Sequence, residues 1–144
     1  MLDDDPDSGN VLCWVIERSY RVLRASTADE AVDFWHEHNG SIGLIVADIF
    51  LSSPVSGTQV AIQVRESSPH VAVLFTSGTP LEGWRDVDFE NFKNLMSGRV
   101  DFLQKPFTAQ ALVRKVDALL NGDWSAIEAQ ALYENATSYR TGFK

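Results

Sequence analysis

The chain has 144 residues, enough for one domain with its own hydrophobic core, and it carries a formal net charge of −8. No stretch gathers enough Lys or Arg to follow a phosphate backbone, which argues against direct nucleic-acid binding. The single cysteine, Cys13, gives neither an internal disulfide nor a metal-ligand set, and the longest wholly apolar run, 11–16, is too short to span a membrane. No secretory signal opens the chain, so a cytoplasmic protein is expected.

Short apolar runs alternate with amphipathic stretches, an order typical of βα units around a parallel sheet. Residues 20–25 are predicted to form a short strand, and 42–47 a continuous apolar strand of the kind buried on both faces. Two further strands are expected at 71–76 and 99–103. Together these runs predict an α/β fold.

Helix signals lie between the predicted strands. Ser26 or Thr27 is placed to cap a helix that ends near residues 39–40. Thr108 is placed to cap a later helix, and Gly122 is placed to end it.

Further helices are predicted from apolar side chains at helical spacing, at 58–66, 88–96 and 125–135. We expect residues 1–122 to form the domain and residues 123–144 to form a partly helical tail beyond it.

Three chemically capable side chains each follow a predicted strand: Asp48, Ser77 and Lys105. Because ligand sites in such sheets form beyond the carboxyl ends of the strands, we expect all three to face one crevice. Asp48 can then act as a nucleophile toward a phosphoryl donor, while Lys105 and Ser77 contact the phosphoryl oxygens. Asp3 and Asp4, at the acidic start of the chain, can hold Mg²⁺, which prefers oxygen ligands.

Each of these features also has an ordinary explanation when it is considered alone. An aspartate after a strand is often a loop cap, and an acidic start is usually a solvated tail. Lys-Pro is a common dipeptide, and Ser-Gly is usually a turn. The order, spacing and strand context of the set together favour a functional site.

In that order and spacing the chain resembles the receiver domain of two-component response regulators, over about residues 3–120. The resemblance implies a flavodoxin-like, doubly wound parallel sheet of five strands in the order 2-1-3-4-5. It also implies that Asp48 accepts a phosphoryl group from a histidine kinase or a phosphotransfer protein.

The same resemblance implies roles for the other site residues. Asp3 and Asp4 match the acidic pair that binds Mg²⁺ together with Asp48 and the backbone carbonyl of Phe50. Ser77, Lys105 and Phe102 match the phosphate-binding and switch positions. Gly57 matches the glycine that follows the acceptor loop.

The start of the chain departs most from the family, because only Met1 and Leu2 precede Asp3 where a receiver has a full apolar strand. Losing about four buried apolar residues forfeits roughly 6–12 kcal/mol. The chain start is then truncated or misassigned, or a partner chain donates the strand, or 11–16 serves as the strand. We favour a helix over 7–16; if the run were the strand, the acidic pair would leave the site.

Three smaller departures follow. The spacing from Ser77 to Lys105 is longer than usual, and within it Trp84 is either an interface anchor or the cover of its own loop. Residues 51–54 resemble a long-loop variant, with Ser52 where the family usually has proline. The tail has no family counterpart, so we expect it to cap the fold, to mediate a homodimer or to lead into a further domain.

The leading functional hypothesis is a phospho-accepting receiver without an output domain, which acts through protein contacts rather than on nucleic acid or membrane. The alternative is a pseudo-receiver that serves as a phosphorylation-independent interaction module. A metabolic phosphatase is disfavoured, since such enzymes usually need a second acid or base near the nucleophile. None of the histidines, His36, His38 and His70, ends a predicted strand, so we expect no enzyme.

Overall fold

A parallel sheet forms the centre of the protein. The computed structural model describes residues 1–38, 40–51, 54–122 and 125–141. Within these ranges the sheet has the order β1 (Leu44–Asp48), β2 (Ala72–Ser77), β3 (Val100–Gln104), with both pairings parallel. The helical elements are α1 (Pro6–Glu17), α2 (Ala28–Glu37), α3 (Gly57–Ser67), η1 (Leu81–Gly83, a 3-10 turn), α4 (Asp86–Leu95), α5 (Ala109–Asn121) and α6 (Ala126–Thr141).

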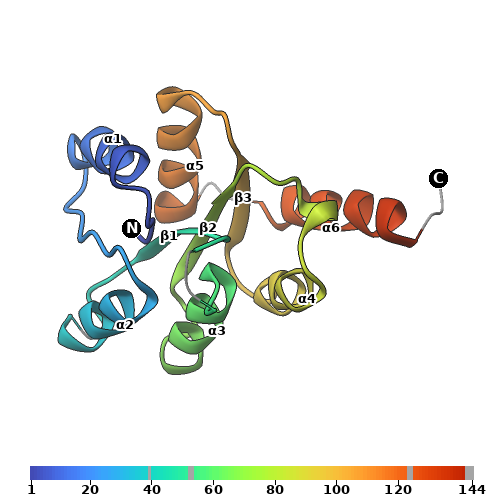
Figure 1. Ribbon diagram of the computed structural model, residues 1–144, viewed down its shortest axis with the longest axis horizontal. Helices are drawn as coiled ribbons and strands as arrows, with labels where there is room; N and C mark the ends of the chain where they lie inside the picture. Colours follow the sequence, from blue (N-terminus) through green and yellow to red (C-terminus); the bar gives the residue numbers. More distant parts are fainter. Residues whose placement is uncertain (39, 52–53, 123–124, 142–144) are drawn as a thin grey trace.

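Helices cover both faces of the sheet: α1 and α5 lie on one face, and α2, α3 and α4 lie on the other (Figure 1). Every residue of β2 is buried. Its neighbours Leu74 and Phe75 belong to two separate apolar clusters, because successive side chains of a strand point to opposite faces. The continuous apolar runs of the sequence therefore reflect burial from both sides. Within the described ranges, no helix combines the length and apolar character that a membrane crossing needs.

The first position of the sheet is filled by only a few residues at the start of the chain. Leu2 makes parallel bridges to Ala25 on one side and to Ala47 of β1 on the other. Its amide donates to the carbonyl oxygen of Val46 at 2.7 Å, and its carbonyl accepts from the amide of Asp48 at 2.9 Å. These bridges give the order Ala25, Leu2, β1, β2, β3, which is the 2-1-3-4-5 order that the resemblance implies.

Two expectations about this region need correction. The sheet of the described residues has three strands rather than five, and the strand predicted at 20–25 is reduced to the single bridge at Ala25. Among the described residues, the backbone of this segment pairs across the sheet only with residues 1–3, through Leu23 and Ala25. Residues 11–16 are not a replacement strand, because they lie inside α1, which begins at Pro6.

Helix ends follow the sequence signals closely. Thr27 caps α2 by accepting a hydrogen bond from the amide of Glu30 at 3.1 Å. Thr108 caps α5 in the same way, and Gly122 ends α5 in the left-handed conformation with φ +83°. The predicted stop of α2 at residue 39 lies outside the described residues.

The guanidinium group of Arg65 joins several segments at the end of the sheet opposite Asp48. Arg65 on α3 donates to the carbonyl oxygens of Val71, Leu95 and Arg99, at 3.0, 2.5 and 2.6 Å. These oxygens precede β2, end α4 and precede β3. A single side chain therefore joins three segments that are distant in sequence.

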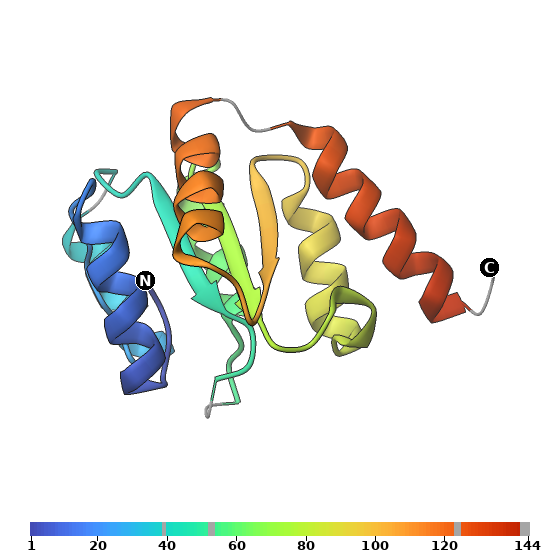
Figure 2. The same ribbon diagram turned by 90° about the horizontal axis from the view of Figure 1, so that it is seen from above.

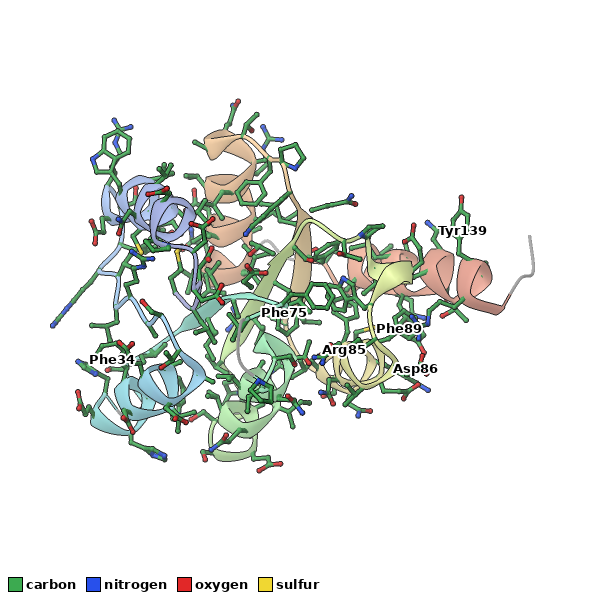
Figure 3. The ribbon with its side chains drawn as sticks, viewed as in Figure 1. Phe34, Phe75, Arg85, Asp86, Phe89 and Tyr139 are labelled. Carbon is green, nitrogen blue, oxygen red and sulfur yellow. The ribbon has the colours of Figure 1, made fainter. Side chains whose placement is uncertain are left out.

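The helix predicted in the tail is longer than expected and packs beside α4 and η1 (Figures 1 and 2). The ring of Tyr133 stacks on that of Phe89 with centroids 4.9 Å apart, and the Arg140 guanidinium lies 4.3 Å from the Phe89 centroid. Arg140 also donates to the carbonyl oxygen of Trp84 at 2.6 Å and pairs with Asp86. Figure 3 shows Phe89 on the side of α4 toward α6. Residues 123–124 and 142–144 of the expected tail lie outside the described part.

Trp84 is buried, so the interpretation of this side chain as an exposed interface anchor is wrong. Its ring packs edge-on against those of Phe75, Phe92 and Phe102, at centroid distances of 6.0, 5.7 and 5.0 Å. Its indole nitrogen donates to the carbonyl oxygen of Thr79 at 3.0 Å. Trp84 therefore anchors the long segment after β2 to the core.

We predict that Gly57→Ala destabilises the protein by about 1–3 kcal/mol. A Cβ at Gly57 would lie 2.1 Å from the carbonyl oxygen of Asp48, so either β1 or α3 must shift. Helix propensity alone would make the alanine variant more stable by about 1 kcal/mol. A loss of stability would therefore show that the close approach of residue 57 to the carbonyl oxygen of Asp48 dominates. Urea denaturation measures it. Gly78→Ala is the matched control, since nothing lies within 4 Å of its Cβ position; equal stability of the two variants would contradict the prediction.

We also predict that Arg140→Ala loosens α6. The lost charge-assisted hydrogen bonds are worth about 1.5–3 kcal/mol, so amide hydrogen exchange in α6 should accelerate by about tenfold or more. Exchange in the three strands should change little. Arg114→Ala, on the exposed side of α5, is the control and should leave α6 unchanged. Unaltered protection of α6 in Arg140→Ala would show that its apolar contacts suffice.

Candidate functional site

Three carboxylates meet at the carboxyl end of the sheet. Asp48 is the last residue of β1, and Asp3 and Asp4 follow directly after the Leu2 bridge. One carboxylate oxygen from each residue lies within 4.8 Å of the others. The carboxyl ends of the strands are where this kind of fold binds ligands.

Lys105 supplies a cation to this cluster. Its ammonium nitrogen lies 3.3 Å from Asp48 Oδ2 and 3.6 Å from Asp3 Oδ2. The residue follows β3, and its amide donates to the carbonyl oxygen of Ser77 at 2.8 Å, which fixes its place beside the end of β2. The peptide bond from Lys105 to Pro106 is cis. Side chains from three segments of the chain thus meet in this cluster: the start of the chain, the end of β1 and the residue that follows β3.

The backbone at the start of the chain holds the acidic pair in place. The Asp3 amide donates to the carbonyl oxygen of Ala25 at 3.2 Å, and Asp3 Oδ1 accepts from the amide of Asp5 at 2.9 Å. The Asp3 side chain is only 2% exposed, whereas that of Asp48 is 13% exposed and that of Lys105 is 27% exposed. Asp48 and Lys105 are therefore more accessible than Asp3.

The electrostatic environment disfavours a charged Asp48. Burial raises the pKa of the Asp48 carboxyl above its ordinary value, Lys105 opposes that shift, and the nearby charge of Asp3 adds to it. A backbone hydrogen bond from Phe50 favours the ionised form. A further cation would relieve the repulsion between these carboxylates.

Residues 1–117, most of the chain, match the family model described as the response regulator receiver domain. The chain belongs to this family of receiver domains.

Relatives of this receiver domain include longer regulators. The uncharacterized transcriptional regulatory protein YrkP of Bacillus subtilis (strain 168) is 30% identical over 121 residues, covering 83% of this chain and 48% of YrkP. The transcriptional regulatory protein SrrA of Staphylococcus aureus (strain NCTC 8325 / PS 47) is 29% identical over 132 residues, covering 91% of this chain and 51% of SrrA. The chain spans about half the length of these curated relatives.

Solved receiver structures have the same architecture. A receiver domain protein (CheY-like) from Methanospirillum hungatei JF-1 aligns with 84% of this chain and 90% of its own, with a TM-score of 0.70 and 21% sequence identity. At this identity the likeness establishes the fold alone, which is the flavodoxin-like α/β fold.

The acidic cluster of this receiver domain is compatible with Mg²⁺. Mg²⁺ binds through one or two carboxylates, keeps several waters, and demands hard oxygen ligands. Asp3, Asp4 and Asp48 offer such oxygens close together, and the repulsion among them favours a divalent cation. That the backbone carbonyl of Phe50 is a further ligand of the metal stays a prediction.

Ser77 and Phe102, the other two predicted site residues, make contacts that lead away from the acidic cluster. Ser77 is buried at the end of β2, and its hydroxyl oxygen accepts from the amide of Thr79 at 3.0 Å. Phe102 is buried in β3 against Trp84, whose indole nitrogen donates to Thr79. The structure thus connects both predicted positions through Trp84, while their roles stay predictions.

One cluster next to the acceptor loop was missed by sequence reasoning. Ser56 caps α3 in a capping box with Gln59, and its hydroxyl donates to the fully buried carboxylate of Asp88 on α4. Thr58 donates to the same carboxylate, and Arg85 pairs with it at 2.9 Å. The Ser-x-x-Gln spacing was a signal for the cap. No local sequence pattern indicated that Asp88 on α4 is the partner of this cap.

Residues 52–53 of the predicted long loop lie outside the described residues.

We predict that Asp48→Asn raises the free energy of unfolding at neutral pH when no divalent metal is present. Burial raises the pKa of Asp48 in the folded protein, so the unfolded chain, with an ordinary pKa of about 3.9, loses this proton more readily. The ionised carboxyl therefore opposes folding above the unfolded pKa. The gain from asparagine should be absent below that pKa and should grow as the pH rises through the folded pKa. Urea denaturation across that pH range measures it.

The control for this experiment is Asp33→Asn, on the exposed side of α2. This substitution should change stability by less than about 0.5 kcal/mol at every pH. A loss of stability in Asp48→Asn at neutral pH would show that the ion pair with Lys105 outweighs burial.

Proposed function

We propose that this receiver domain accepts a phosphoryl group on Asp48 from a histidine kinase or a phosphotransfer protein, and that it signals through protein contacts. The observation that carries the proposal is the partly exposed carboxylate of Asp48, set 3.3 Å from Lys105 and beside two further carboxylates. This combination pairs a nucleophile with the cations that phosphoryl transfer needs. The cytoplasm is the compartment that fits this function.

In the proposed reaction, a carboxylate oxygen of Asp48 attacks the phosphorus atom of a phosphohistidine. A P–O bond to Asp48 forms, the P–N bond breaks, and the imidazole leaves with the bonding electrons and takes up a proton from solvent. Lys105 holds an oxygen of the transferring group, and Asp3 and Asp4 would hold Mg²⁺. When bound, Mg²⁺ neutralises charge that develops on the phosphoryl group.

The product changes the charge at the end of β1. An acyl phosphate adds roughly two negative charges and strong hydrogen-bond acceptors. The Ser77 hydroxyl is the predicted donor at the end of β2, and its hydrogen bond with the Thr79 amide leads to Trp84, Phe102 and α6. We therefore propose that the surface formed by η1, α4 and α6 carries the signal to a protein partner.

The test is the intact mass of the chain after incubation with acetyl phosphate, with and without Mg²⁺. We expect a gain of one phosphoryl group that requires Mg²⁺ and is lost in Asp48→Asn. Lys105→Ala should slow the gain by about tenfold or more, as expected for loss of a cation that contacts the transferring group. Asp33→Asn should behave like the unaltered chain.

The pseudo-receiver hypothesis makes the opposite prediction. No gain in mass at any Mg²⁺ concentration, from a chain whose far-UV circular dichroism shows it to be folded, would overturn phosphorylation and leave an interaction module. A gain that persists in Asp48→Asn would place the acceptor elsewhere.

A further inference from the structure

A buried carboxylate joins the start of α3 to the start of α4. The side chain of Asp88, in the first turn of α4, is fully buried. Its Oδ1 accepts hydrogen bonds from the hydroxyls of Ser56 and Thr58, and its Oδ2 accepts one from Nε of Arg85 at 2.9 Å. Asn91 donates to the hydroxyl oxygen of Thr58 at 3.2 Å. Since a buried charge costs free energy unless it is hydrogen-bonded, these donors compensate the burial of the carboxylate.

The beginnings of both helices add to this attraction. Ser56 is the N-cap of α3, and Asp88 is the third residue of α4. The two helices lie side by side on one face of the sheet (Figure 1). The partial positive charge of a helix N-terminus favours a carboxylate nearby. A neutral side chain at position 88 would weaken these interactions, so the start of α3 would be held less firmly against α4.

The residue that follows Ser56 lies against the backbone of Asp48. A Cβ at Gly57 would be only 2.1 Å from the carbonyl oxygen of Asp48. That carbonyl belongs to the same peptide group as the amide of Ile49, which donates to the carbonyl oxygen of Thr76 in β2 at 3.1 Å. The Gly57 amide in turn donates to the carbonyl oxygen of Ile49 at 3.2 Å. The start of α3 and the peptide group after Asp48 are therefore held to each other by a close contact and a hydrogen bond.

The place of this peptide group matters for the acidic cluster. Asp48 Oδ2 lies 3.3 Å from the ammonium nitrogen of Lys105, and the Asp48 side chain extends from the same backbone that Gly57 contacts. A group transfer depends on positioning, and a misplacement of about 1 Å can cost about 10²-fold in rate. The hydrogen bonds of Asp88 go to α3 and Arg85, so its effect on Asp48 would pass through the start of α3.

We propose that Asp88 is a positioning residue for phosphoryl transfer to Asp48. Its hydrogen bonds with the hydroxyls of α3 fix the start of that helix, and Gly57 then fixes the peptide group after Asp48 relative to Lys105. This role rests on the proposed function, since the reaction that it assists is the transfer to Asp48. It differs from a role in packing alone, in which loss of the charge lowers stability but leaves the reaction of the folded chain unchanged.

The test compares the rates at which folded chains are phosphorylated by acetyl phosphate with Mg²⁺, measured as intact mass. Asp88→Asn keeps the shape of the side chain but removes its charge, and Thr58→Val removes one donor. We expect the maximal rate to fall by about tenfold in Asp88→Asn and by about threefold in Thr58→Val. The half-saturating concentration of acetyl phosphate should not change, because the altered groups do not contact it. Thr58→Val decides the outcome if Asp88→Asn does not fold.

Val64→Ala is the matched control, because it removes buried apolar atoms from the same helix, further along α3. Far-UV circular dichroism identifies a temperature at which all the chains are folded. At that temperature Val64→Ala should be phosphorylated at the rate of the unaltered chain. If Asp88→Asn and Thr58→Val keep that rate as well, the carboxylate serves packing alone, and the proposal is overturned while the proposed function stands.

Amide hydrogen exchange tests the positioning without a phosphoryl donor. We expect the Ile49 amide to exchange about tenfold faster in Asp88→Asn than in Val64→Ala, because it shares a peptide group with the carbonyl that Gly57 contacts. Faster exchange confined to α3 and α4 would overturn the proposal. If the unaltered chain takes up no phosphoryl group, the proposed function fails and the assisted reaction with it, whatever the exchange at Ile49.

Discussion

The backbone hydrogen bonds at Leu2 are the constraint on which the rest of the protein depends. Leu2 joins β1 to the segment at Ala25 and thereby closes the sheet across its first position. Asp3 comes directly after it and reaches Asp48 and Lys105 only in this register. A slip by one residue would turn the following side chains to the other face of the sheet. Fold and site are therefore secured by the same two residues at the start of the chain.

The site itself balances burial against charge. Three carboxylates approach one another at the end of the sheet, and Lys105 offsets part of their repulsion. Burial raises the pKa of Asp48, so a further positive charge close to the cluster would stabilise its ionised form. Under the proposed function this arrangement would help to recruit a divalent cation and then to hold a highly charged product, because each added charge would relieve the repulsion left by the others.

Local patterns in the sequence were sufficient for most of the fold. The apolar runs at 42–47, 71–76 and 99–103 correspond to the three strands, and Thr27, Thr108 and Gly122 mark helix ends as predicted. Asp48 and Lys105 were expected to meet from their places after predicted strands, and Asp3 and Asp4 were expected beside them from the acidic start of the chain and the resemblance to receiver domains. The failures concern partners distant in sequence. The run at 20–25 has strand character but lacks a full neighbour, Trp84 is buried by rings from three elements, and Asp88 is paired by hydroxyls about thirty residues earlier. No local pattern encodes such contacts.

The guanidinium of Arg65 has a consequence for how α4 behaves. It holds the carbonyl oxygen of Leu95 at the last turn of α4, while Asp88 in the first turn is fixed by Ser56 and Thr58. Because both of its ends are held by residues of α3 and its N-cap, we expect α4 to stay fixed against α3 rather than to pivot. In the proposed signalling route, a disturbance at Ser77 would pass into residues 78–85, which join β2 to α4, and from there into α6 through the hydrogen bond of Arg140 to the carbonyl oxygen of Trp84.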